Sequence, residues 1–148
     1  MFEDFYLDIE LIGDVKQPVR GTAESAGIDF FSPCDIHIEP NSQVLIPLAV
    51  KVRFARGYVM MLKEKSSISS KNNVDIGASI IDSDYRGVIH AHLINNNFDK
   101  LIFFQKGIKI IQGIIVPIWL GKINIVKKID DITGRNECGF GSTGERWC

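Results

Sequence analysis

The chain has 148 residues, a formal net charge of −1 and 45% hydrophobic residues. This length suits one domain with a sizeable core, and the near-neutral charge argues against global attraction to nucleic acid or acidic lipid. No apolar run approaches the length of a membrane span, and the acidic start at residues 1–4 lacks the basic region of a signal peptide. We therefore expect a soluble, intracellular protein of the cytoplasm.

The three cysteines, Cys34, Cys138 and Cys148, are scattered along the chain. An odd number at irregular spacing does not indicate a disulfide framework, and no Cys-x-x-Cys or Cys/His pattern indicates a zinc site. We expect each cysteine to be a free thiol.

Turn signals and runs of β-branched or aromatic residues predict a series of short strands. The expected strands cover residues 6–12, 27–31, 35–39, 44–52, 58–63, 74–81, 88–95, 101–104, 108–120 and 123–126. Residues 15–25 predict a loop, Pro47 predicts an edge or a bulge, and residues 65–71 predict a helix kept short by four serines. The pattern indicates an all-β sandwich, barrel or jelly roll over residues 1–131, followed by a flexible, glycine-rich tail over 132–148.

The predicted strands 74–81 and 88–95 read as a β-hairpin or bend. Its mouth holds Asp82, Asp84, Tyr85 and Arg86, and Gly87 allows a backbone angle that other residues resist. A simple hairpin needs no such combination, whereas a pocket for a polar ligand with a ring does. The alternative is a solvated surface pair of Asp84 and Arg86, with Tyr85 packed as an ordinary strand residue.

The tail has an unusual composition, with four glycines, an arginine, a phenylalanine and two hydroxyls within residues 134–144. Glycine-rich backbone amides, hydroxyls and a guanidinium suit a phosphate cradle, and the phenylalanine could stack on a base. The segment is not a Walker loop, because no Gly-Lys-Ser/Thr sequence closes it. A disordered terminus is the alternative.

Five segments resemble, in order, the five motifs of the homotrimeric dUTP pyrophosphatase (dUTPase) family. They are Ala26-Gly27-Ile28-Asp29, Lys65-Ser66-Ser67-Ile68, residues 77–87, residues 107–112 and residues 135–144. The third and fifth are the most specific of these. The resemblance implies an all-β subunit of the β-clip or jelly-roll type with one short helix, assembled as a homotrimer whose active sites are shared between chains.

The resemblance also implies a reaction, the hydrolysis of dUTP to dUMP and pyrophosphate, which limits uracil incorporation into DNA and supplies dUMP for thymidylate synthesis. By this resemblance, Asp82 is the catalytic carboxylate that orients the water attacking the α-phosphorus and takes its proton. Gln112 helps to hold that water or the phosphates. Asp29 reaches Mg²⁺ through a bound water, while the substrate phosphates provide most of the chelation.

The other matched residues would bind the substrate. The phosphate-binding motif is Lys65, Ser66 and Ser67, and Tyr85 packs on the deoxyribose and excludes a 2′-hydroxyl. Main-chain groups of the hairpin read uracil, which places around the base Ile76, Ser79, Ile80, Ile81 and His90. The tail closes over the site: Phe140 stacks on uracil, and the segment that grips the γ-phosphate contains Arg135, Gly141, Ser142 and Thr143.

Several positions depart from the family pattern. Lys65 stands where arginine is usual, which keeps the charge but loses the bidentate fork. Ile108 and Lys109 stand where aspartate and arginine are usual, and Asn136 and Cys138 replace glycines of the fifth motif. We expect these changes to affect efficiency and tail motion rather than reaction class.

Three alternatives remain open. His90 and His92 lie on one face of a strand and could bind a metal, although packing is the simpler interpretation. A dCTP deaminase of similar fold should carry a glutamate about where His92 lies, and no acidic residue occurs between Gly87 and Asn97. The third alternative is a non-catalytic nucleotide sensor or partner-binding protein on the same fold. An enzyme is distinguished from it by Asp82, Gln112 and an intact tail, all of which are present.

Overall fold

The structure, a computed structural model, describes residues 6–129. Over this range the chain forms twelve strands and one helix, which confirms the all-β class with one short helix. In chain order the elements are β1 Leu7–Leu11, β2 Val19–Arg20, β3 Ile28–Phe31, β4 Ile36–Ile38, β5 Gln43–Pro47, β6 Val50–Phe54, β7 Tyr58–Glu64, α1 Ser66–Asn72, β8 Val74–Ile76, β9 Ile80–Asp82, β10 His90–Asn95, β11 Ile102–Phe104 and β12 Lys109–Pro117. No helix among these described residues has the length and apolar character needed to cross a membrane.

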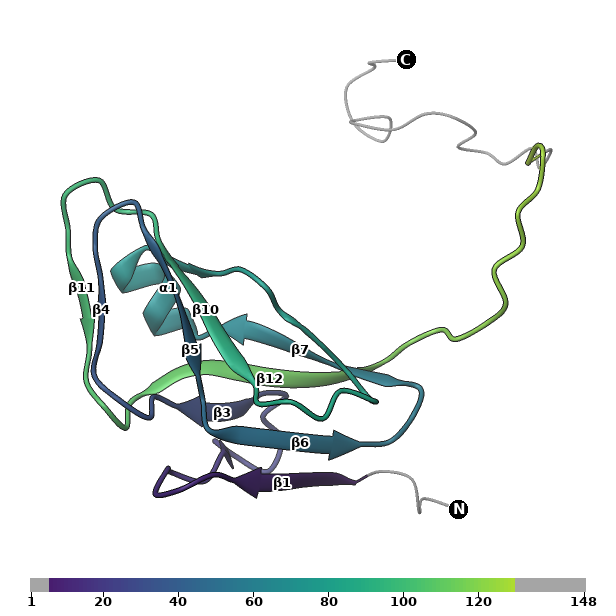
Figure 1. Cartoon of the computed structure of the whole chain (residues 1–148), viewed down its shortest axis with the longest axis horizontal. Coiled ribbons are helices and arrows are strands. Elements are labelled where there is room, and N and C mark those ends of the chain that lie inside the picture. Colours follow the sequence, from purple (N-terminus) through teal and green to yellow (C-terminus); the bar gives the residue numbers. More distant parts are fainter. Residues whose placement is uncertain (1–5, 130–148) are drawn as a thin grey trace.

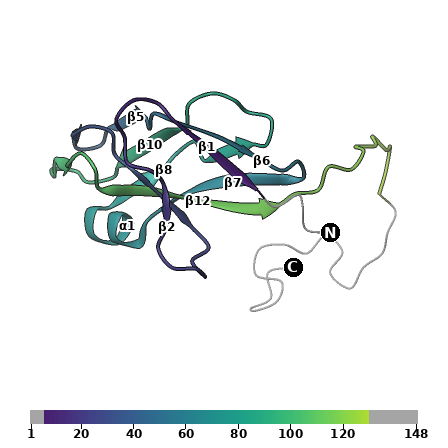
Figure 2. The same cartoon turned by 90° about the horizontal axis from the view of Figure 1, so that it is seen from below.

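The strands pair antiparallel in two larger sheets and two short ladders. The larger sheets have the orders β2-β3-β12-β7-β9 and β5-β10-β8, and the short ladders join β1 to β6 and β4 to β11. In Figure 1, β7 and β12 run side by side along the long axis of the molecule. Figure 2 places β5 and β10 in one layer and β7 and β12 in another, with α1 at one end.

The hydrophobic core lies where these layers meet. Phe30 and Met60 of the larger sheet and Leu93 of the smaller one have no exposed surface and belong to one cluster. In β10 the buried residues alternate with half-buried ones, as a strand with one face on a core requires. The same alternation places His90 and His92 together on the other face of β10, as the sequence predicts.

Asn95 is a polar residue inside this core, with 1% of its surface exposed. Its side-chain amide donates hydrogen bonds to the carbonyl oxygens of Ile38, Glu39 and Lys100 at 2.9–3.0 Å. These bonds tie the end of β10 to the end of β4 and to the chain that enters β11. A buried amide with all its partners fixes the position of these three segments.

The predicted strand 44–52 is interrupted after Pro47. Ala49 has a left-handed backbone with φ of 57°, and the chain bends there from β5 into β6. As a result β5 pairs with β10, whereas β6 pairs with β1. Pro47 ends β5, which is an edge strand of its three-stranded sheet, so the edge predicted at Pro47 is confirmed. The break that follows moves one apolar run from one sheet to another.

The predicted hairpin of 74–81 with 88–95 is wrong in its second half. β8 pairs with β10, but β9 pairs with β7 in the larger sheet, and β10 begins only at His90. The chain therefore crosses between sheets at residues 77–79. The sequence could not reveal this, because a strand's composition does not specify which neighbour it joins.

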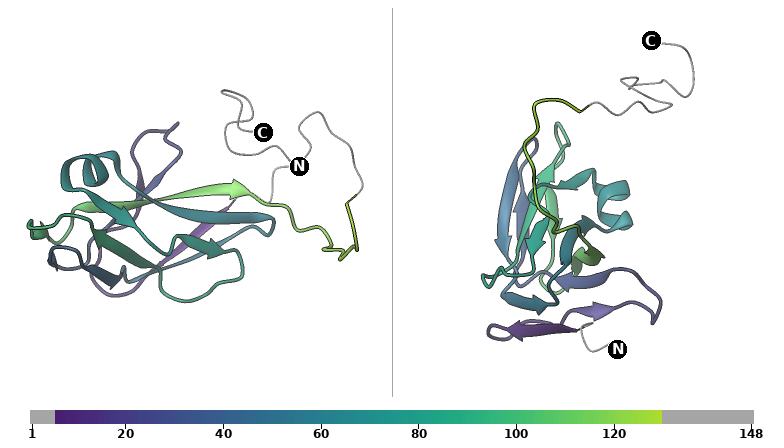
Figure 3. Two further views of the ribbon diagram at one scale, coloured as in Figure 1. Left: turned by 90° about the horizontal axis from the view of Figure 1, so that it is seen from above. Right: turned by 90° about the vertical axis from the view of Figure 1, so that its right-hand side faces the viewer.

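The segment after β12 leaves the sheets, as Figure 1 and the left view of Figure 3 show. The strand predicted at 123–126 does not form, because these residues have no ladder partner among the described residues. The predicted strand 108–120 correspondingly ends at Pro117.

Candidate functional site

One cluster of charged residues forms where β3, β12 and the start of α1 meet. Asp29 of β3 is 5% exposed. One of its carboxylate oxygens accepts from Lys65 Nζ at 2.5 Å, and the other pairs with Lys109 Nζ at 2.8 Å. Lys65 is the N-cap residue of α1 and Lys109 opens β12, so three elements hold one carboxylate between two ammonium groups.

The electrostatics of this cluster keep Asp29 ionised. Burial raises the pKa of Asp29, but the hydrogen bonds from Lys109 and then Lys65, together with their charges, outweigh it, so the pKa lies below its usual value. Two cations around one carboxylate leave the cluster with a formal charge of +1. Such a cluster beside solvent suits a phosphate chain, because its lysines remain 24% and 41% exposed.

Gln112 lies beside this cluster, opposite Asp29 in the β3–β12 ladder. Its amide donates to Glu64 O at 3.0 Å, which holds the side chain over β7. A Cβ at Gly27 would lie 2.1 Å from Gln112 Oε1 and 3.1 Å from Gln112 Cβ, so a side chain there would displace the Gln112 amide. The first and fourth motif-like segments therefore pack directly against each other at Gly27 and Gln112.

A second group of predicted residues lies at a fork between the two larger sheets. β8 follows β10 as far as Gly77, whose N–H donates to His92 O at 2.9 Å. Beyond that point β9 joins β7, and His90 pairs with Pro47 on its opposite edge. No ladder joins β9 to β10 within residues 6–129, so the edge of 79–81 that faces away from β7 and the edge of His90 that faces away from β5 have no strand partner there.

The loop 83–87 follows the catalytic candidate Asp82, which is exposed at the end of β9. Tyr85 Oη donates to Val88 O at 3.0 Å, and Arg86 donates to the carbonyl oxygens of Ser83 and Tyr85, both at 2.8 Å. The Tyr85 ring covers Gly87, where an added Cβ would lie 2.2 Å from Oη. Asp82 lines a cavity of about 660 Å³. The other residues that line it are Tyr6, Phe54, Arg56, Ser83, Asp84, Arg86, Ile118 and Leu120.

Comparison with known proteins assigns this arrangement to a family. A dUTPase family model matches residues 14–144. The chain belongs to the dUTPase family. It is 37% identical over 132 residues to the deoxyuridine 5'-triphosphate nucleotidohydrolase of Fowlpox virus, covering 87% of this chain and 90% of that protein.

Solved structures of dUTPases have the same fold. The G164S mutant dUTPase of Staphylococcus bacteriophage 80alpha with dUpNHpp superposes with a TM-score of 0.87 at 28% identity, over 95% of this chain and 99% of that one. The D95N mutant dUTPase of phage phi11 of S. aureus, described with a structural Mg(II) ion, has a TM-score of 0.80 at 25% identity, over 85% of this chain and 99% of that one.

The two groups of site residues are separated within this dUTPase chain. Asp82 lies opposite Val59 and Gln112 lies opposite Lys63, on the two sides of β7. Four residues along a strand and two strand spacings across it put their Cα atoms roughly 16 Å apart. One chain therefore brings together Asp29, Lys65 and Gln112, but it does not bring Asp82 to them.

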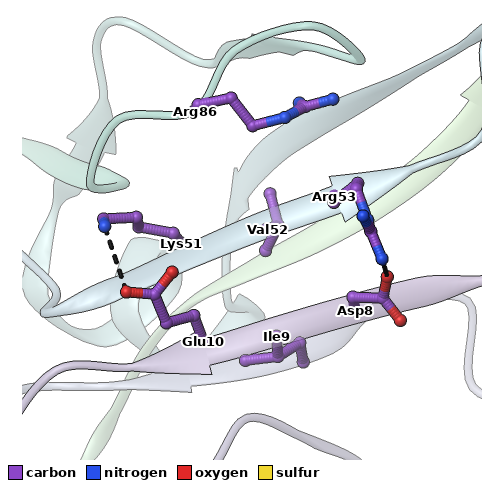
Figure 4. Close-up of a pocket in the computed structure, with 7 residues that line it drawn as sticks. All are labelled: Asp8, Ile9, Glu10, Lys51, Val52, Arg53 and Arg86. Atoms are coloured by element: carbon purple, nitrogen blue, oxygen red, sulfur yellow. Dashed lines mark hydrogen bonds and ion pairs between the residues drawn. The ribbon is translucent and has the colours of Figure 1, made fainter.

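A different pocket of the dUTPase chain, of about 380 Å³, lies over the β1–β6 ladder (Figure 4). Here Asp8 faces Arg53 and Glu10 faces Lys51 in direct cross-strand register, with ion pairs of 2.5 and 3.0 Å. The pKa of Arg53 is raised by its hydrogen bond to Asp8. The two ion pairs neutralise one another, but Arg86 also lines the pocket and leaves it with a formal charge of +1. Of its lining residues only Arg86 belongs to a motif-like segment, so this pocket is a weaker candidate than the lysine cluster.

Lys109 is the residue that sequence reasoning undervalued. It departs from the family pattern, yet it pairs with Asp29 at 2.8 Å, beside Lys65 at 2.5 Å. The available signal was its positive charge at a position where the family pattern has arginine.

The remaining candidate residues have mixed outcomes. Ser66 and Ser67 are exposed in the first turn of α1, and Ile76 ends β8. The residues Arg135, Phe140, Gly141, Ser142 and Thr143 lie outside the described residues, as do Cys138 and Cys148. Cys34 is a free, exposed thiol, as predicted.

The His-x-His pair is used for hydrogen bonds in the structure. His90 Nδ1 donates to Val88 O at 2.9 Å, and both ring nitrogens of His92 have protein partners. Among residues 6–129, no group of three or more histidine, cysteine, aspartate or glutamate side chains is arranged to hold a metal ion.

Proposed function

We propose that this chain hydrolyses dUTP to dUMP and pyrophosphate. The observation that carries the proposal is the net-positive cluster of Lys65, Lys109 and Asp29 beside Gln112, in a member of the dUTPase family. The Fowlpox virus relative is named for action on deoxyuridine triphosphate, and the phage 80alpha enzyme was solved with dUpNHpp. A cationic cluster of this size suits the triphosphate of such a nucleotide.

In this proposal each half of the site has its own task. Lys65, with Ser66 and Ser67, binds the phosphates, while the unpaired main-chain edges of 79–81 and His90 read uracil. A fixed main-chain edge rejects cytosine, because its mismatched donor and acceptor would leave buried groups unpaired.

The reaction itself needs a positioned water. Asp82 takes the proton of a water held by Gln112, the water oxygen bonds to the α-phosphorus, and the bond to the bridging oxygen breaks to release pyrophosphate. Tyr85 packs on the deoxyribose. The tail residues Arg135, Phe140, Ser142 and Thr143 close over the bound nucleotide.

Magnesium fits this site only through the substrate and water. Both oxygens of Asp29 already accept from lysines, yet each carboxylate oxygen retains a second acceptor position. Asp29 would therefore hold a water of the Mg²⁺ shell rather than the ion, and the ion would offset charge on the phosphates. The Mg(II) ion described for the phage phi11 enzyme supports metal use in the family.

A homotrimer with shared sites would join the two halves. Asp82 and Gln112 lie on opposite sides of β7, so a second copy must supply one of them. The segment after β12 also exposes apolar side chains that a single chain leaves uncovered: Trp119 is 74% exposed, Ile123 79%, Ile125 93% and Ile129 81%. Burial of such side chains against another copy would stabilise the assembly.

The proposal is tested by a substrate panel of dUTP, dCTP, dTTP and UTP with the wild-type chain and Asp82→Asn. We expect turnover of dUTP alone, with pyrophosphate as product, and a loss of about 10²–10⁴-fold in kcat for Asp82→Asn with KM little changed. Asp84→Asn, two residues further along the same cavity, is the matched comparison and should lose far less. Near-normal kcat in Asp82→Asn, or ammonia release from dCTP, would contradict the proposal.

A further inference from the structure

The crossing segment of residues 77–79 is held to its surroundings by three hydrogen bonds. Gly77 N–H donates to His92 O at 2.9 Å, and Ser79 O accepts from Leu62 N–H at 2.7 Å. Between them, Ala78 N–H donates to a side chain, the Nδ1 atom of His92, at 3.0 Å. Among the bonds of residues 6–129, this side-chain bond alone fixes the middle of the segment where it passes from one sheet to the other.

The protonation of the His92 ring follows from its two partners. A backbone N–H can only donate, so Nδ1 must carry no proton and must accept from Ala78. The proton then lies on Nε2, which donates to Gln43 Oε1 at 2.8 Å. Gln43 of β5 thus fixes the neutral tautomer that holds Ala78, as a second group commonly orients a functional imidazole.

The ring of His92 also determines the shape of the crossing. A Cβ on Gly77 would lie 2.0 Å from Nδ1 and 2.5 Å from Cε1. The imidazole therefore packs directly against the backbone of Gly77 while it bonds to Ala78. The Gly77–Ala78 backbone can move toward β10 only if the ring moves first.

We infer that His92 is a positioning residue that holds the 79–81 edge at its working distance from His90, and so contributes to discrimination between bases. This inference rests on the proposed function, in which these two edges read uracil. Ala78 is adjacent to Ser79 in the chain, and His92 is two residues from His90 on the same face of β10. One side chain therefore bridges the two edges just beside the point where they diverge.

Three variants separate this role from simple packing. His92→Phe keeps a ring but removes both hydrogen bonds, whereas His92→Asn places an amide oxygen close to the position of Nδ1 and can still accept from Ala78. His37→Phe is the matched control, because His37 is an exposed histidine of β4 whose ring packs against the ring of Phe103.

The kinetic measurement is kcat/KM for dUTP, dTTP and dCTP. Loss of the bond to Ala78 corresponds to about three- to tenfold, so His92→Phe should raise KM for dUTP and lower the dUTP preference by that factor, with kcat nearly unchanged. His92→Asn should recover most of the preference, and His37→Phe should match the wild type. A folded His92→Phe protein with wild-type KM and preference, or no recovery in His92→Asn, would overturn the inference.

Hydrogen exchange of the nucleotide-free protein gives a second measurement that does not depend on catalysis. Exchange at Ala78 should accelerate about three- to tenfold in His92→Phe and not in His92→Asn. Unchanged exchange would overturn the inference even if the chain hydrolyses dUTP. A wild-type chain without dUTP hydrolysis, but with accelerated exchange in His92→Phe, would instead contradict the proposed function and remove the base-selecting role while leaving the anchoring of Ala78 in place.

Discussion

At the scale of single residues, the central feature is the buried carboxylate of Asp29 and the two lysines that compensate its charge. Asp29 is almost fully buried, and two lysines on different elements keep it ionised. Arginine would hold a carboxylate through a planar fork, whereas two ammonium groups act as separate point charges. The charge of Asp29 is therefore compensated by both lysines together rather than by one bidentate pair.

The lowered pKa of Asp29 predicts a specific dependence of stability on pH. Because its folded pKa lies below the unfolded value of about 3.9, the ionised group stabilises the fold above that value and loses this effect as pH falls through the folded pKa. Asp29→Asn should therefore be less stable than the wild type at neutral pH, with a difference that shrinks below about pH 4. Thermal unfolding from pH 7 to pH 2.5, with the exposed Asp99→Asn as control, checks this. Curves that stay parallel throughout would contradict it.

At the scale of elements, the fold is organised by β10 and by the crossing that precedes β9. β10 pairs with β5 and β8, buries alternate residues in the core, and ends at Asn95, whose amide bonds to three carbonyls. The crossing at 77–79 then separates β9 from β10 and leaves two main-chain edges unpaired. A continuous hairpin would have satisfied those groups internally, so the proposed reading of uracil depends on this crossing.

The hydrogen bonds of Asn95 predict that truncation of this one side chain lowers the stability of the fold substantially. Asn95→Ala leaves carbonyl groups of Ile38, Glu39 and Lys100 without their donor and should lower the free energy of unfolding by about 2–4 kcal/mol. Asn96→Ala removes an exposed amide that bonds to Asp75 and should cost less than about 1 kcal/mol. Urea unfolding of both variants measures the difference. Equal losses would mean that the buried junction adds no more than a surface contact.

At the scale of the whole molecule, the separation of Asp82 from Gln112 is the main fact. Neither loop motion nor a rotamer change closes a gap that spans β7, because the strands on both sides belong to one hydrogen-bonded sheet. Assembly of identical chains is the economical way to bring the two halves together, since a symmetric oligomer repeats the same junction at every interface.

A complementation experiment tests this shared site. Asp82→Asn and Gln112→Leu chains should each be inactive alone, yet random co-assembly should restore about a quarter of the native sites, because one junction in four combines two intact halves. Sedimentation should give three times the chain mass of 16.6 kDa. Mixed trimers without recovered activity, or a monomer under assay conditions, would show that one chain builds its own site.

The sequence by itself determined the all-β class, the single short helix, most strand positions and the residue types of the site, because these depend on local composition, turn chemistry and short motifs. It also placed Pro47 at a sheet edge and located the shared face of His90 and His92. Tertiary structure alone decided that β9 pairs with β7 rather than with β10, and that Lys109 pairs with Asp29 beside Lys65. It also decided that His92, oriented by Gln43, accepts a hydrogen bond from Ala78. These features are contacts between residues far apart in the chain, and the choice of a strand's neighbour depends on packing of the whole core rather than on the strand's own residues.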